Sequence, residues 1–257
     1  MADLFIDPGI DPFIDVDGTF NFRDVGGRRT RDGGKTRTGV LYRSASLDRL
    51  TERGRTVLDS LGIGLVVDVR SSAELERHGR FAFEGSSIEW HHVDSGFGPP
   101  VAAERPGDNE VFEADDPMSV VFRMIVEVAD SLLATPLQLF ARTDQPMVFH
   151  CTSGKDRTGF IAFLVQMIAG VDPEDAFEDF ELSAAAMGTV RADMEARFPE
   201  MAKLEPHKLD RMAGADRRWI IDALDPVGGV GDLDPWLDSI GVDRATRDAI
   251  RRRFVMV

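Results

Sequence analysis

The sequence has little cysteine and comparatively little positive charge. Its single cysteine, Cys151, excludes a disulfide within the chain and a zinc site built from several cysteines. Lys plus Arg number 30 against 45 Asp plus Glu, which gives a formal net charge of −15 over 257 residues. Such an acidic chain argues against binding to nucleic acid or to an anionic membrane surface, because like charges repel. An anionic substrate would therefore need a local positive site.

Long hydrophobic runs are also missing. No apolar stretch reaches about 18 residues, the length typical of a membrane-spanning helix, and the first residues contain no basic segment followed by an apolar one. We therefore expect no stable membrane insertion and no signal peptide of the usual kind. The expected location is the cytoplasm, with signal-less secretion left open, and the expected state is a monomer.

Short strand patterns alternate with helical patterns along the chain. The predicted strands are Val40–Tyr42, Leu65–Val69, Ile88–Val93 and Met147–His150. The predicted helices are Thr51–Leu61, one beginning at the capping-box sequence Ser71–Glu74, Met118–Leu133, one beginning at Thr135, Thr158–Ala169, one beginning at Asp172, and a pair within Trp236–Phe254. The alternation predicts a single α/β domain over residues 1–257, with a central, mostly parallel sheet in a three-layer α/β/α arrangement.

Two segments do not fit this alternation. Gly96–Pro117 is rich in glycine, proline and acidic residues and predicts a loop. Residues 184–225 have a helical composition but a weak apolar stripe. We predict that this second segment is a helical insertion, or lid, that packs loosely over a site.

The stretch Phe149–Gly159, FHCTSGKDRTG, carries the strongest chemical signal. Five residues separate Cys151 from Arg157, between a predicted strand and a predicted helix. A loop this short can turn its N–H groups around a tetrahedral dianion at the N-terminus of the helix, and the same positive field favours a thiolate. Arg157 can bind two phosphoryl oxygens at once. The candidate phosphate-binding residues are Thr152, Ser153, Gly154, Lys155, Arg157 and Thr158, with Lys155 expected at the rim.

This arrangement predicts a two-step phosphatase reaction. The Cys151 thiolate attacks phosphorus, an acid protonates the leaving oxygen, and water then hydrolyses the phosphocysteine. Asp156 is the nearest candidate acid, although it could instead cap the helix, and Asp94 is the alternative acid. Thr158 could steady the thiolate.

Other residues are candidates for supporting roles. His150 could orient the loop. Arg43 and Asp68 lie at predicted strand ends, where they could support the site or brace loops with ion pairs. Arg23 and Asp24 are expected to form a structural pair that ties the N-terminal segment to the core.

A rival signal lies near the N-terminus. The residues Asp15–Thr19, DVDGT, resemble the nucleophile motif of Mg²⁺-dependent phosphatases, in which a buried strand leads into the first aspartate. Here Asp11 and Pro12 precede it, and both residue types are poor in strands. The later ligands of a calcium-binding loop are also missing, because Phe22 or Gly26 stands where Glu is required. We interpret the motif as a chance match and expect neither a metal nor a cofactor.

The sequence HCTSGKDRTG resembles the H-C-x-x-G-K-D-R-T-G signature of the bacterial and fungal tyrosine phosphatases of the mycobacterial secreted type. FNFRDVGG, LYRSASL and VVDVRSSAE are similar to that family's other markers and occur in the family's order. The resemblance implies a protein-tyrosine-phosphatase-like fold, Cys151 as nucleophile, Arg157 as phosphate binder and Asp156 as acid. It also implies a mobile helical lid, and a Lys155 that widens the substrate range from phosphotyrosine to phosphoserine, phosphothreonine and phosphoinositides.

Three functions remain to be compared. The first is a cysteine-dependent phosphatase that acts on phosphorylated proteins or phospholipid headgroups. The second is a catalytically silent phosphate-binding module with the same loop, against which the joint presence of Cys151, Asp156 and Arg157 weighs. The third is a Mg²⁺-dependent phosphatase that uses Asp15.

Overall fold

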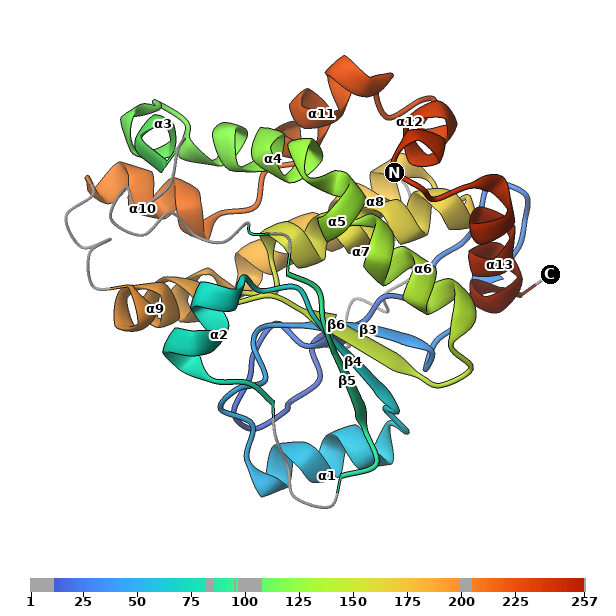
Figure 1. Ribbon diagram of the computed structural model, residues 1–257, viewed down its shortest axis with the longest axis horizontal. Helices are drawn as coiled ribbons and strands as arrows, with labels where there is room; N and C mark the ends of the chain where they lie inside the picture. Colours follow the sequence, from blue (N-terminus) through green and yellow to red (C-terminus); the bar gives the residue numbers. More distant parts are fainter. Residues whose placement is uncertain (1–11, 82–85, 95, 97–107, 199–204, 257) are drawn as a thin grey trace.

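A five-stranded sheet forms the centre of the molecule (Figure 1). The computed structural model describes residues 12–81, 86–94, 96, 108–198 and 205–256. The strands lie in the order β1-β3-β6-β4-β5, and only β1 runs antiparallel to its neighbour. Their bounds are Arg23–Asp24 (β1), Leu41–Ser44 (β3), Leu65–Asp68 (β4), Glu89–His92 (β5) and Met147–His150 (β6). The predicted, mostly parallel sheet is confirmed.

Helices surround the sheet and a second, smaller sheet. The helices are α1 (Glu52–Ser60), α2 (Ser72–His78), α3 (Asp108–Glu113), α4 (Pro117–Glu127), α5 (Ala129–Leu132), α6 (Ala134–Arg142), α7 (Asp156–Ala169), α8 (Pro173–Glu181), α9 (Met187–Arg197), α10 (Pro206–Ala213), α11 (Arg218–Leu224), α12 (Asp234–Ser239) and α13 (Arg244–Phe254). Strands β2 (Lys35–Thr36) and β7 (Val255–Met256) pair antiparallel. Within the described residues, no helix has the length and apolar character needed to cross a bilayer.

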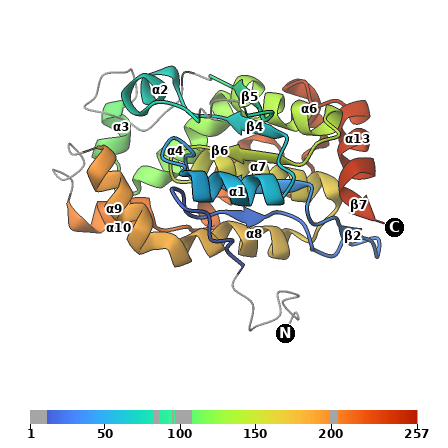
Figure 2. The same ribbon diagram turned by 90° about the horizontal axis from the view of Figure 1, so that it is seen from below.

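Alternate residues of the central strands face opposite sides of the sheet. Leu65, Val67 and Phe149 pack into a large core that also contains buried residues of α4, α6, α7 and α11. Val66 and Val148 belong to a smaller core that includes Leu58 of α1. Figure 2 shows α1 in front of the sheet and α7 behind it. The three-layer α/β/α fold is therefore confirmed.

Local signals explain several helix ends. Thr51 caps α1, Asp172 caps α8 with proline next to it, and Ser71 forms with Glu74 the capping box predicted for α2. The helical pattern predicted over Met118–Leu133 is divided into α4 and α5 at Val128.

The loop predicted over Gly96–Pro117 is partly wrong, because α3 occupies Asp108–Glu113 and α4 begins at Pro117. Residues 97–107 of that prediction lie outside the described residues. Val111 of α3 is buried in the large core, so apolar packing overrides the polar composition of the stretch.

In the described part of the segment 184–225, helices α9 and α11 pack differently. In α9, the buried side chains of Val190 and Arg197 contrast with exposed positions such as Thr189 and Glu195. In α11, Trp219, Ile220, Ala223 and Leu224 are all buried in the large core. The predicted loose packing is therefore wrong for α11, which packs against α4 as part of the main core.

Two adjacent isoleucines of α11 test this assignment. Ile220 is fully buried, whereas Ile221 is 38% exposed. We expect Ile220→Ala to lower the free energy of unfolding by about 2–5 kcal/mol, because the cavity that it leaves cannot collapse fully. The matched control Ile221→Ala should change it by less than about 1 kcal/mol. Urea denaturation followed by circular dichroism measures both, and equal small effects would show that α11 does not belong to the core.

Candidate active site

Cys151 follows directly after β6, at the carboxyl end of the parallel strands, where α/β proteins place their sites. Residues 151–155 join β6 to α7, which begins at Asp156. The cysteine side chain is free of any disulfide and the residue is only 1% exposed. The loop therefore holds a protected sulfur next to the N-terminus of a long buried helix.

Donors from the surrounding chain hold the carbonyl groups of this loop. The N–H of Ser46 donates to the carbonyl of Thr152 at 3.0 Å. The Asn21 side chain donates to the carbonyls of Ser153 and Gly154, at 3.2 and 3.1 Å. Arg43 Nη2 also donates to the carbonyl of Gly154, at 2.9 Å. These donors fix the directions of consecutive peptide groups.

The carbonyl directions determine where the loop N–H groups point. In a planar trans peptide the N–H lies opposite the carbonyl of the same unit. With the carbonyls of Thr152, Ser153 and Gly154 turned outward to their donors, the following N–H groups turn inward. Within the described part of the chain, the N–H groups of Ser153, Gly154 and Lys155 donate to no residue. Such a ring of amides at a helix N-terminus is suited to binding an anion.

Gly154 is required by the path of this loop. Its φ is +68°, in the left-handed region that L side chains rarely adopt. A Cβ atom there would lie 2.4 Å from the carbonyl carbon and oxygen of Ser44. Both the conformation and the close approach to β3 therefore exclude a side chain at this position.

A buried carboxylate, Glu74, orients Arg157. Arg157 Nη1 donates to Glu74 Oε2 at 2.7 Å and Nη2 donates to Oε1 at 2.9 Å, while Nη1 also lies 3.2 Å from the carbonyl of Val69. Burial raises the pKa of Glu74, but the charge and hydrogen bonds of Arg157 outweigh it and hold that pKa below its usual value. This bidentate pair fixes the plane of the guanidinium.

Glu74 is a site residue that the sequence analysis missed. Its capping-box role at α2 was predicted, and the structure confirms that Glu74 Oε2 accepts from the N–H of Ser71 at 2.8 Å. The same carboxylate also accepts a hydrogen bond from Thr152 Oγ1. Glu74 therefore links the start of α2 to the cysteine loop, a contact 78 residues apart in sequence.

Asp179 of α8 organises the opposite side of the loop. Its carboxylate accepts from Arg23 Nε at 3.1 Å and from Arg43 Nη1 at 2.7 Å, and all three side chains are buried. Burial raises the pKa of Asp179, but these arginines together with Arg28 lower it far below its usual range. Arg43 joins Asp179 to the carbonyl of Gly154, so it both forms an ion pair and contacts the cysteine loop.

The expected pairing of Arg23 with Asp24 is wrong. Arg23 binds Asp179 and Asn21, whereas Asp24 accepts from the N–H groups of Gly26 and Gly39, at 2.7 and 2.6 Å. The two residues therefore connect β1 to the rest of the protein through different partners. The strand alternation explains this, since neighbours along β1 face opposite sides of the sheet.

His150 and Asp68 lie together in the interior next to the nucleophile. His150 Nε2 is 3.7 Å from Asp68 Oδ2, and His150 Nδ1 is 3.2 Å from the carbonyl of Cys151. Asp68 in turn binds Arg70 Nη2 at 2.7 Å. Burial lowers the pKa of His150, although Asp68 has the opposite effect. The lowered pKa favours the neutral imidazole.

Lys155 does not have the rim position expected from its place in the loop. It is fully buried, its Nζ donates to the carbonyls of Met212 and Gly214, and it lies 5.5 Å from the ring centre of Trp219. Nζ is also 3.2 Å from Asp156 Oδ1. The lysine therefore connects the cysteine loop to α10 and α11 instead of facing solvent.

The remaining candidates are placed as follows. Asp156 is the first residue of α7, and its side chain is 23% exposed. Thr158 Oγ1 is buried and has no hydrogen-bond partner among the described residues. Asp94 accepts from Ser72 Oγ and from the N–H of Gly96. These bonds outweigh burial and hold the pKa of Asp94 below its usual value, which makes it a poor proton donor.

Asp15 lies in a stretch, residues 12–20, that forms no strand. It belongs to an irregular segment, its side chain is 87% exposed, and it pairs with Arg53 at 3.3 Å. Within the described residues 12–14, no strand leads into Asp15 as the Mg²⁺-dependent interpretation requires. Among the residues that the structure describes, no three His, Cys, Asp or Glu side chains are grouped as a metal site would need.

Comparison with known proteins identifies the family of the chain. Residues 14–256 match the model of the tyrosine phosphatase family. The chain belongs to the tyrosine phosphatase family. The resemblance seen in its motifs is thereby confirmed, and so is its expected enzyme class, protein-tyrosine phosphatase.

Three relatives illustrate the similarity. The chain is 26% identical to the triple specificity protein phosphatase PtpB of Mycobacterium tuberculosis, over 92% of this chain and 97% of that one. It is 30% identical to a putative tyrosine-protein phosphatase of Cupriavidus necator, over 62% of this chain and 59% of the relative. It is 28% identical to a tyrosine-protein phosphatase of Nostoc commune, over 84% and 74%. The similarity to two of these proteins thus extends over most of the domain.

The role of Glu74 can be tested with an isosteric change. Glu74→Gln keeps the shape of the side chain but removes the charge that holds Arg157, so we expect kcat/KM for an aryl phosphate to fall on the order of 10- to 100-fold. Glu76→Gln, at an exposed position of the same helix, is the matched control and should leave kcat/KM unchanged. Steady-state kinetics with both folded variants gives the answer, and wild-type values for Glu74→Gln would remove its positioning role.

Proposed function

We propose that this protein is a cysteine-dependent phosphatase that hydrolyses phosphotyrosine through a phosphocysteine intermediate. The observation that carries the proposal is the buried sulfur of Cys151 at the start of a loop whose carbonyls are held outward, with Arg157 fixed by Glu74 at its end. Inward amides and a guanidinium can bind the three non-bridging oxygens of a phosphate monoester.

In the first step, the Cys151 thiolate attacks phosphorus. A sulfur–phosphorus bond forms and the bond from phosphorus to the tyrosine oxygen breaks. Asp156 gives its proton to that oxygen, so tyrosine leaves as a neutral phenol. Arg157 and the loop amides stabilise the charge on the equatorial oxygens of the phosphoryl group. These donors already point toward the phosphate position before the reaction begins, so they need no reorientation.

In the second step, water attacks the phosphocysteine. Asp156, now a carboxylate, accepts the proton of the attacking water, and the sulfur–phosphorus bond breaks. Inorganic phosphate and the Cys151 thiolate result, so the enzyme returns to its initial state. Both steps balance with the substrate, one water molecule and the side chains of Cys151 and Asp156.

We favour phosphotyrosine in proteins as the substrate. The buried position of Lys155 argues against a simple extension to other phosphorylated substrates. The resemblance implied that Lys155 extends activity to phosphoserine, phosphothreonine and phosphoinositides. Its Nζ is instead occupied by the carbonyls of Met212 and Gly214. We infer that activity on these further substrates would require Lys155 to leave those carbonyls, or would depend on other residues.

Replacing the nucleophile tests the reaction class. Cys151→Ser should keep its affinity for inorganic phosphate, because the amides and Arg157 remain, while turnover of an aryl phosphate falls by at least about a thousandfold. Isothermal titration and steady-state kinetics measure the two properties. Undiminished turnover would exclude the proposal, and a wild-type protein that binds phosphate without any turnover would favour the silent binding module.

The same assay separates the metal-dependent rival. Wild-type activity should persist in EDTA, and Asp15→Asn should match the wild type. Complete loss in EDTA together with loss in Asp15→Asn would favour the aspartate mechanism.

The acid role of Asp156 can be tested through the leaving group. Asp156→Asn cannot donate a proton, so we expect it to slow phenyl phosphate on the order of 100-fold or more, because a poor leaving group needs the proton most. An activated substrate such as p-nitrophenyl phosphate should slow far less. Asp94→Asn is the control and should behave like the wild type on both. If both substrates slow equally in Asp156→Asn, the acid lies elsewhere.

A further inference from the structure

Asp48 is a buried carboxylate that the reaction itself does not use. It follows β3, and its side chain is 3% exposed. It accepts a hydrogen bond from Ser46 Oγ. The N–H of Ser46 holds the carbonyl of Thr152 at 3.0 Å. Asp48 is therefore connected through Ser46 to Thr152, the residue that follows the nucleophile.

A second series of contacts runs from Asp48 to the residue before the nucleophile. Arg70 Nη1 lies 3.8 Å from Asp48 Oδ1, while Arg70 Nη2 binds Asp68 at 2.7 Å. Asp68 faces His150 at 3.7 Å. All of these side chains are buried. The two series meet the chain on either side of Cys151, so one carboxylate is linked to both flanks of the reacting sulfur.

The counter-charge for Asp48 comes from a distant helix. Arg197, the last residue of α9, donates from Nη1 to Asp48 Oδ2 at 3.1 Å and from Nη2 to Oδ1 at 3.2 Å. Its Nε binds Asp193, one turn earlier in the same helix, at 2.9 Å. Arg197 is 5% exposed, and the contact spans 149 residues of sequence. A bidentate pair of this kind fixes orientation as well as charge.

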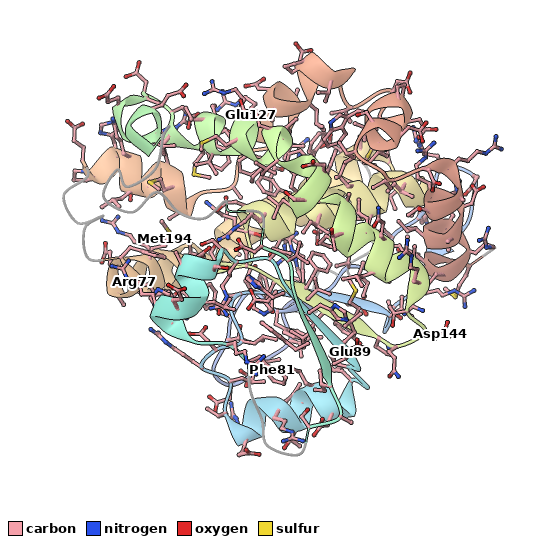
Figure 3. The ribbon with its side chains drawn as sticks, in the orientation of Figure 1. Arg77, Phe81, Glu89, Glu127, Asp144 and Met194 are labelled. Carbon is pink, nitrogen blue, oxygen red and sulfur yellow. The ribbon has the colours of Figure 1, made fainter. Side chains whose placement is uncertain are left out.

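Packing holds the same end of α9 against α2. The ring of Phe198 meets the ring of His78 edge-on at 5.6 Å, and the guanidinium of Arg77 lies 5.7 Å from the Phe198 ring centre. Figure 3 labels Arg77 of α2 and Met194 of α9 at the same end of the molecule, far from Asp144, which follows α6. The Asp48–Arg197 contact is thus part of a defined docking of α9.

Loss of Arg197 would leave Asp48 with an alternative partner. Arg70 Nη1 is buried and makes no hydrogen bond within the described residues, although it points toward Asp48. A buried carboxylate deprived of Arg197 would move toward this free donor, because an uncompensated buried charge is unfavourable. Since Ser46 bonds to Asp48, that movement would displace the N–H that holds the carbonyl of Thr152.

We propose that Asp48 and Arg197 form a positioning pair that sets the geometry of the cysteine loop and couples it to the docking of α9. The pair acts through Ser46 on Thr152 and through Arg70 and Asp68 on His150, without touching the substrate. The effect of the pair on kcat rests on the proposed phosphatase reaction. The effect of the pair on the affinity of the loop for inorganic phosphate does not depend on that reaction.

The test compares two arginines of the same helix. Arg197→Met removes the buried donor, whereas Arg191→Met removes an exposed arginine that pairs with Glu195 and Asp210. Both variants are assayed well below their melting temperatures. We expect Arg197→Met to lower kcat for an aryl phosphate about tenfold and to weaken inorganic phosphate binding several-fold, since small displacements of a catalytic loop have large effects on rate. Arg191→Met should match the wild type.

Further variants exclude a purely structural role. Asp48→Asn should show the same defects, and the double variant Asp48→Asn/Arg197→Met should be no worse than either single variant, because both act through one contact. Arg197→Lys, which keeps the charge but loses the bidentate geometry, should be intermediate and covers the case in which Arg197→Met does not fold.

The outcomes separate this inference from the proposed reaction. A lower melting temperature with unchanged kcat and phosphate affinity in folded Arg197→Met or Arg197→Lys would overturn the positioning role. Defects that add up in the double variant would also contradict it. Turnover that survives in Cys151→Ser would overturn the proposed reaction alone, because the phosphate affinities of the Arg197 and Asp48 variants would still report on the loop.

Discussion

The site depends on the outward orientation of the carbonyl groups in residues 152–154. Because the peptide unit is planar, every donor that holds a carbonyl from outside also turns an N–H toward the centre. Asn21, Arg43 and the N–H of Ser46 supply these donors. The loop itself contributes only Gly154, whose positive φ permits the turn. The anion-binding geometry is therefore built by residues from several strands and loops, not by the loop sequence alone.

The local positive potential does not come simply from basic residues. Arg157 is paired with Glu74, and Arg43 and Arg23 share Asp179, so each buried arginine near the loop has a carboxylate partner. Such pairs add little net charge, but they fix the directions of the donors. The attraction for a dianion then comes mainly from the inward amides and the N-terminus of α7. This explains how a chain with a net charge of −15 can hold a phosphate site.

The sequence predicts the centre of the site better than its supports. The short spacing from Cys151 to Arg157, between a strand and a helix, was enough to place the loop, and the capping box placed the start of α2. The second role of Glu74, and the roles of Asp179 and Asp48, depend on contacts 83, 136 and 149 residues apart in sequence. No local pattern encodes such contacts. The rim position predicted for Lys155 was wrong for a similar reason, since its partners, Met212 and Gly214, lie at the C-terminal end of α10.

Helices α9 and α11, which follow η1 (Leu182–Ala186), are attached to the site in different ways, and this limits how they could move. Displacing α11 would expose Trp219 and Ile220 to water, at a free-energy cost of several kcal/mol. Displacing α9 would expose few apolar side chains but would break the contact between Arg197 and Asp48. Local opening favours elements with few buried apolar contacts. Movement of these helices would therefore begin in α9, and it would first affect the loop that holds the nucleophile.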